Sequence, residues 1–119
     1  MKKTVLFGAS LNSHRYSNKA IRLLRDYGHE VVAIGLKQGE VADVIIQTDK
    51  PKVTDVDTVT LYLSPPRQPL FYDYILSLNP KRIIMNPGTE NNELKELAQK
   101  KGIEVVEHCT LVMLNMGDF

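Results

Sequence analysis

Short apolar runs alternate along this chain with segments in which apolar residues recur at helical spacing. Runs without polar alternation, such as residues 5–9 and 31–34, are typical of strands buried on both faces of a parallel sheet. The run at 58–63 is rich in β-branched residues, which also favours a strand. In all, six runs predict strands, at residues 5–9, 31–34, 44–46, 58–63, 83–85 and 103–106.

The segments between these runs predict helices. In residues 17–27 the apolar side chains fall on one helical face, and Gly28 follows as a stop. Residues 70–78 show the same spacing before Asn79-Pro80 ends it. Two further helices are expected: one that Asn91 or Asn92 caps and Gly102 ends, and a short terminal one at 111–116.

This order of elements predicts an α/β protein with a doubly wound parallel sheet of five or six strands in a single domain. Ligands of such sheets bind at the carboxyl ends of the strands, beside the point where the strand order reverses. The loops expected to form a site are therefore 8–17, 35–39, 64–68 and 86–91.

Length and composition agree with a small globular protein. The 119 residues fit one domain. The composition, with 43% hydrophobic and 24% charged residues, argues against a disordered chain or a coiled coil. A net charge of +1 gives no overall field that would attract nucleic acid or an anionic membrane, so neither partner is expected. An anionic ligand would have to be held by local groups.

The cysteine content and the start of the chain bear on the compartment. Cys109 is the single cysteine, which excludes an intramolecular disulfide and a cysteine-based metal site. The first apolar run stops at Gly8, too early for the core of a signal peptide, and no run is long enough to span a membrane. We therefore expect a cytoplasmic protein.

The first loop carries groups suited to phosphate. Gly8 lets a ligand approach the backbone, Ser10 and Ser17 offer hydroxyl donors, and Arg15 can grip two phosphate oxygens. The start of the following helix adds backbone N–H groups that favour an anion. The alternative is that these residues only form a turn and that Ser17 is an ordinary N-cap.

The second strand bears on which nucleotide fits. The three-glycine fingerprint of dinucleotide sites is absent, and Gly35-Leu36-Lys37 stands where an NAD site has an acidic residue for the ribose. A lysine favours a ribose carrying a 2′- or 3′-phosphate. Lys37 is equally compatible with a solvated surface position.

Taken together, these residues resemble the small CoA-binding domain family, which is Rossmann-like and related to the CoA-binding domain of the succinyl-CoA synthetase α subunit. The resemblance runs from the first strand to Cys109. It implies that the first loop holds the CoA diphosphate and that the lysine after the second strand lies near the nucleotide. The residues that we expect to bind the cofactor are Gly8, Ala9, Ser10, Asn12, Arg15, Ser17, Gly35, Leu36, Lys37, Ser64, Pro65, Pro66, Asn86 and Gly88.

Two motifs depart from the family pattern. Gly35-Leu36 replaces a frequent Asn-Pro, and Asn86-Pro87-Gly88 replaces a frequent Gln-x-Gly. These departures concern the adenosine and the thiol end of CoA more than the diphosphate. Tyr16, in the first loop, is the best candidate for stacking on adenine.

No catalytic constellation is found. His108 and Cys109 are adjacent, and neighbouring side chains on a strand point to opposite faces. His14 lies in the first loop and could donate to an anion, but a loop histidine is more often simply exposed to solvent. The function expected is therefore a non-catalytic module that binds CoA or acyl-CoA, acting through a protein partner or as a homodimer. The alternatives are a flavodoxin-like FMN-binding oxidoreductase and an NADP-binding domain.

Overall fold

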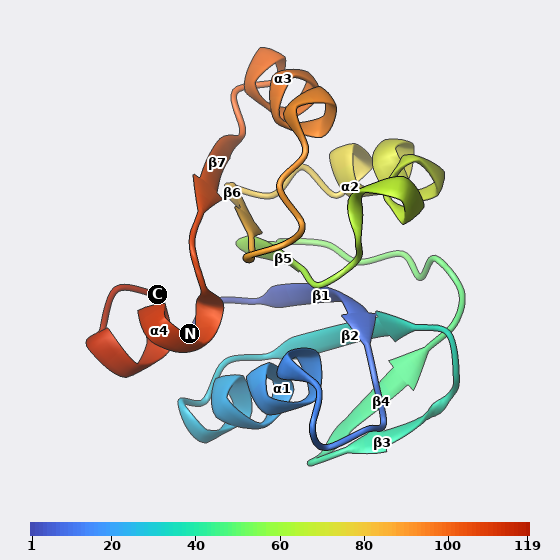
Figure 1. Cartoon of the computed structure of the whole chain (residues 1–119), viewed down its shortest axis with the longest axis vertical. Helices are drawn as coiled ribbons and strands as arrows, with labels where there is room; N and C mark the ends of the chain where they lie inside the picture. The colour runs from blue at the N-terminus through green and yellow to red at the C-terminus, as the bar shows by residue number, and fades with distance from the viewer.

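A seven-stranded sheet runs through the middle of the computed structural model, which describes residues 1–119 (Figure 1). The strands are β1 (Thr4–Ala9), β2 (Val31–Gly35), β3 (Gly39–Val41), β4 (Val44–Gln47), β5 (Thr58–Leu61), β6 (Arg82–Met85) and β7 (Glu104–Glu107). Their order is β3-β4-β2-β1-β5-β6-β7, and every neighbouring pair is parallel except β3 and β4. Because β1 lies between β2 and β5, the strand order reverses beside its carboxyl end.

Helices cover both faces of the sheet, which confirms the predicted doubly wound α/β fold. The helices are α1 (Tyr16–Asp26), α2 (Tyr72–Ser77), α3 (Asn92–Lys100) and α4 (Thr110–Met116), with 3₁₀ turns η1 (Pro65–Arg67) and η2 (Pro69–Phe71) before α2. Figure 1 shows α1 and α4 together on one side and α2 and α3 on the other. Asn91, one of the two residues predicted as the cap, caps α3 by accepting the N–H groups of Glu93 and Leu94.

The two faces bury separate hydrophobic clusters, and β1 contributes to both. Val5 and Phe7 pack with α2 and α3, whereas Leu6 packs with α1. Strict alternation would place Ala9 beside Phe7, but Ala9 packs with Leu6 instead. A bulge in the pairing with β2, between Phe7 and Ala9, accounts for the change of face.

The strand count is seven, so the predicted count of five or six is too low. The missed strand is β3, which pairs antiparallel with β4 at the edge of the sheet. Ala42, at φ 55°, helps to form the tight turn between them. Three residues that include a glycine carry too little apolar pattern to be recognised as a strand.

The helix predicted over residues 70–78 is also wrong at its beginning. The prolines of this segment begin two 3₁₀ turns, and the α-helix starts only at Tyr72. In the second turn the N–H of Phe71 donates to the carbonyl of Gln68, three residues earlier, at 2.8 Å, which is the 3₁₀ pattern and not the α-helical one. Leu70 is 78% exposed and does not belong to the apolar stripe that was assigned to it.

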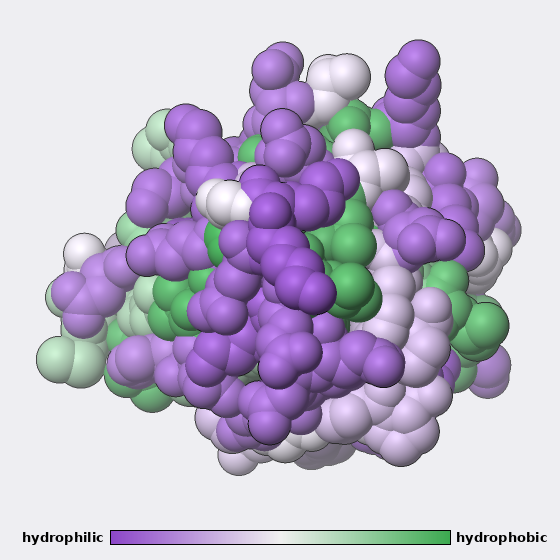
Figure 2. Space-filling view, turned by 90° about the horizontal axis from the view of Figure 1, so that it is seen from above, coloured by the Kyte–Doolittle hydropathy of each residue, from purple (hydrophilic) through white to green (hydrophobic).

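The surface seen from the side of α3 is covered mostly by hydrophilic side chains, with smaller hydrophobic patches between them (Figure 2). The two ends of the chain lie beside α4 (Figure 1), where Lys2 Nζ donates to the main-chain oxygen of Phe119 at 2.8 Å. None of the helices combines the length and the apolar character that crossing a membrane requires.

Candidate functional site

A cavity of about 650 Å³ lies at the carboxyl ends of β1, β2, β5 and β6. These four strands are adjacent in the sheet, and the strand order reverses among them. Each of the four loops predicted to form a site contributes to its wall. The cavity is therefore located where doubly wound sheets bind ligands.

Hydrogen bonds within the β1–α1 loop fix its conformation. Asn12 N–H donates to Ser10 Oγ at 3.1 Å, and Asn12 Oδ1 accepts the N–H of His14 at 2.9 Å. Asn18, which is buried on α1, donates from Nδ2 to the carbonyl of Ser10 at 2.9 Å. The loop is thus held at both ends before any ligand arrives.

The beginning of α1 is uncapped. Arg15 occupies the N-cap position, its side chain caps no N–H group, and no acidic residue lies in the first turn. Ser17 is not the N-cap, so the reading that gave it that role is wrong; it lies inside the helix and is buried. The free N–H groups and the helix dipole make this end favourable for an anion.

Gly8 is required by the fold. Its φ is +89°, and an added Cβ would lie 2.7 Å from the carbonyl carbon and 2.8 Å from the carbonyl oxygen of Tyr62. Those atoms belong to the main chain that follows β5, which cannot rotate away. The sequence predicted that this glycine admits a ligand, but the main reason for a glycine at this position is the close approach of β1 to β5.

The charges around the cavity are all positive. Arg15, Lys37 and Arg67 line it, and no aspartate or glutamate does. All three side chains are exposed, and none takes part in any of the four ion pairs of the protein. Although the whole chain is nearly neutral, this cavity presents a local positive potential.

The structure brings most of the sequence-predicted residues together at this cavity. Those that line it are Gly8, Ala9, Ser10, Asn12, Arg15, Tyr16, Ser17, Gly35, Leu36, Lys37, Ser64 and Gly88. Pro65 and Pro66 do not line it, because they form the 3₁₀ turn η1 behind Ser64. Asn86 does not line it either.

Asn86 is held inside the protein. It is 1% exposed, and its Nδ2 donates to Thr60 Oγ1 and to the carbonyl of Leu61, both at 2.7 Å. Its Oδ1 accepts the N–H of Thr110 at 2.8 Å. The side chain therefore joins β5, β6 and the start of α4, and no polar atom of its amide is left to face a ligand.

Sequence reasoning missed several cavity residues. Arg67 lies in the 64–68 loop, which was predicted to form part of the site. A positive charge just after the fourth predicted strand was therefore a signal from which this residue could have been found. Phe7 and Phe71 also line the cavity, with their ring centroids 5.6 Å apart in an edge-to-face arrangement. Phe7 falls in a predicted buried strand and Phe71 in a predicted helix, where an aromatic residue gives no separate sign of a cavity.

Tyr62 is a further lining residue with an unusual environment. Its hydroxyl is buried and has no hydrogen-bond partner. Burial is the main cause that raises the pKa of this phenol, and the neighbouring Cys109 raises it further. Tyr62 therefore stays neutral at physiological pH.

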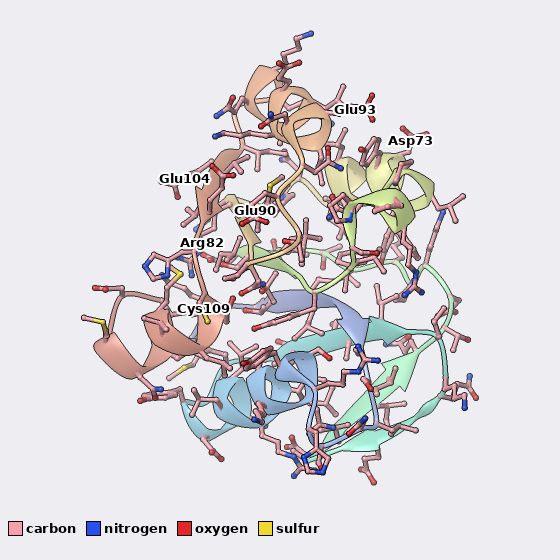
Figure 3. All side chains as sticks on the ribbon, in the orientation of Figure 1. Asp73, Arg82, Glu90, Glu93, Glu104 and Cys109 are labelled. Atoms are coloured by element: carbon pink, nitrogen blue, oxygen red, sulfur yellow. The ribbon has the colours of Figure 1, made fainter.

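The histidine and cysteine near the end of the chain lie outside the cavity. Cys109 is at the N-cap of α4 (Figure 3), and its N–H donates to His108 Nδ1 at 2.8 Å. The imidazole thus bonds the main chain rather than the thiol. No group of three or more histidine, cysteine, aspartate or glutamate side chains lies close enough together to hold a metal ion.

Known proteins resemble this chain in sequence and in structure. A family model described as a CoA binding domain matches residues 2–115. A crystal structure of an uncharacterized protein is 50% identical, with a TM-score of 0.97, and the match covers 100% of this chain and 98% of that one. No curated protein matches the sequence.

More distant structures share the fold. The structure of cell-free ID.343 from Thermus thermophilus is 20% identical with a TM-score of 0.83, over 99% of this chain and 91% of that one. A conserved hypothetical protein from Pyrococcus furiosus, Pfu-723267-001, is 23% identical with a TM-score of 0.76, over 89% and 92%. At 20% and 23% identity, these two matches show a shared fold and nothing further.

Proposed function

The chain belongs to the CoA binding domain family, and from that membership we propose that it binds CoA or an acyl-CoA in the cavity at the carboxyl ends of β1, β2, β5 and β6. The observation that carries the proposal is the charge of this cavity, three cations without an acid. CoA carries a diphosphate and a 3′-phosphate, so it needs such a local positive field. The proposed binding unit is the whole chain, residues 1–119, as a single domain, because both halves of the sheet contribute to the cavity.

The diphosphate is proposed to lie at the beginning of α1. There the uncapped N–H groups, the Ser10 hydroxyl and the Arg15 guanidinium come from one braced loop. A guanidinium and a helix N-terminus act on the same anion, the first through charge-assisted hydrogen bonds and the second through its dipole. Tyr16, 68% exposed at the cavity wall, presents an aromatic face for adenine.

The 3′-phosphate is assigned to Lys37. This lysine follows β2, next to the β1 loop in the strand order, and no acidic side chain neutralises it. The pantetheine arm then extends to the other side of the β1 loop, towards Ser64 and Gly88 after β5 and β6. From β2 to β6 there are three strand spacings, about 14 Å, so the ligand lies extended across the edge of the sheet.

The proposed role is non-catalytic. The cavity wall has no histidine, cysteine, aspartate or glutamate, so no general base stands beside its serine hydroxyls. The module would act by presenting or sequestering CoA, through a protein partner or a second copy of itself.

The test compares CoA with dephospho-CoA, which lacks only the 3′-phosphate, by calorimetric titration. Wild-type protein should bind CoA more tightly than dephospho-CoA, by about tenfold, the value of one charge-assisted contact. Lys37→Gln should remove this difference by weakening CoA alone. Lys52→Gln, which changes an exposed lysine outside the cavity, is the matched charge control and should change neither affinity.

Absence of CoA binding would refute the function itself. Equal affinity for CoA and dephospho-CoA in the wild type would refute the role of Lys37. Tight binding of FMN or NADP without a CoA signal would favour the oxidoreductase or NADP-binding alternative instead.

A further inference from the structure

The third cation of the cavity, Arg67, has no function in the arrangement described above. Its guanidinium makes no hydrogen bond and no ion pair, although its residue lines the cavity wall. Arg15 and Lys37 already face the two phosphate groups of the proposed ligand. An unpaired arginine in a cavity without acids is a binding group for a further anion.

The main chain that carries Arg67 is fixed against the rest of the cavity. Gln68, the next residue, is fully buried, and its Nε2 donates to the carbonyl of Leu63 at 2.8 Å and to that of Thr89 at 2.9 Å. Its Oε1 accepts from Asn91 Nδ2 at 2.9 Å. The turn after β5 is thereby fastened to the loop after β6, so Arg67 projects from a rigid support.

The strand order places Arg67 on the side opposite to Lys37. Lys37 follows β2 and Arg67 follows β5, with the phosphate loop of β1 between them. A CoA molecule with its 3′-phosphate at Lys37 and its diphosphate on the β1 loop directs its arm towards β5 and β6. The pantetheine arm is uncharged, so the anion that Arg67 faces must come from what the thiol carries.

The wall next to Arg67 suits a short carbon chain. Phe7, Leu63 and Phe71 line this side of the cavity with apolar surface, to which the methylene groups of an acyl chain can pack. Glu90 lies in the adjoining loop after β6 (Figure 3), where its Oε1 accepts the N–H of Gly88 at 2.8 Å. Glu90 does not line the cavity and is exposed, so it leaves Arg67 free for the ligand.

We propose that the protein prefers acyl-CoA thioesters whose acyl group ends in a carboxylate, and that Arg67 binds this carboxylate. The proposal rests on the proposed CoA function, because the position of the arm follows from the phosphate contacts. It names a ligand class, the dicarboxylic acyl-CoA thioesters, and a specificity-determining residue that carries out no chemistry.

The experiment is a calorimetric comparison of matched thioesters. Malonyl-, succinyl- and glutaryl-CoA are each titrated against the thioester in which a methyl group replaces the carboxylate: propionyl-, butyryl- and valeryl-CoA. At least one acid should bind the wild type about tenfold more tightly than its partner, the effect expected of one charge-assisted contact at a partly exposed site. Arg67→Gln should abolish that preference while the affinity for free CoA stays within about twofold.

Lys52→Gln, with the same loss of charge outside the cavity, should keep the preference intact. Equal binding of all three pairs by the wild type, with free CoA still bound, overturns the inference and leaves the proposed function standing. A loss of free-CoA affinity in Arg67→Gln also overturns it, because Arg67 then contacts a phosphate. Failure of every CoA species to bind overturns both.

Discussion

Replacing Gly8 by alanine tests the account of how β1 and β5 are held together below the cavity. A residue with a Cβ at φ +89° costs about 1–2 kcal/mol in backbone strain. The added methyl would also lie 2.7 Å from the carbonyl carbon of Tyr62, and an overpacked contact of this kind costs about 1–3 kcal/mol. The free energy of unfolding should therefore fall by about 2–5 kcal/mol. For a chain of this length, that is a fall in Tm of roughly 8–20 °C.

The contact cannot relax easily, because Tyr62 N–H donates to the carbonyl of Phe7 at 2.8 Å and ties the two main chains together. Gly102→Ala is the matched control: its φ is +76°, and no atom lies within 4 Å of the added Cβ. It should cost the backbone strain alone, about 1–2 kcal/mol. Both variants are measured by urea denaturation. Equal destabilisation of the two would refute the close approach of β1 to β5.

Three further predictions concern single side chains. Arg15→Ala should weaken CoA binding in calorimetry by about 1.5–3 kcal/mol, roughly 10- to 150-fold, with Tm unchanged because its side chain is exposed; an unchanged affinity would remove it from the site. Asn86→Leu should lower the free energy of unfolding by about 2–4 kcal/mol, since buried partners on β5 and α4 lose their hydrogen bonds; a cost below about 0.5 kcal/mol in urea would contradict this. Burial lowers the pKa of His29 below its ordinary 6.5, so the folded state favours the neutral ring, whose Nδ1 accepts the N–H of Lys2 at 3.0 Å. Stability from this group is complete above about pH 6.5 and is lost as the pH falls, and a plot of Tm against pH should flatten in His29→Gln; an unaltered slope would disprove the linkage.

The fold could be predicted because its main signals are local. Uninterrupted apolar runs and helical spacing identified every central strand and the helices on both faces. The errors fall where the apolar pattern is weak, or where main-chain hydrogen bonding determines the type of helix. The three residues Gly39–Val41 gave no sign of the edge strand β3, and the 3₁₀ turn that begins at Pro69 occupies the start of the helix expected from residue 70.

The site was predictable as a set of loops and less so as individual side chains. The carboxyl ends of parallel strands lie at one edge of the sheet, so the sequence could predict that Arg15 and Lys37 belong to the same site. Which side chain turns inward depends on tertiary hydrogen bonds, as Asn86 shows by bonding Thr60 and Thr110 rather than facing the cavity. No sequence pattern distinguishes these two orientations.

The most direct measurement is a calorimetric titration of ligand-free protein with CoA, set beside NADP, NAD, FMN and ADP under the same conditions. We predict saturable binding of CoA, with an affinity well above that for NAD and FMN. Added salt should abolish the binding signal, because phosphate contacts supply much of the affinity. Tight FMN binding with no CoA signal would contradict this prediction.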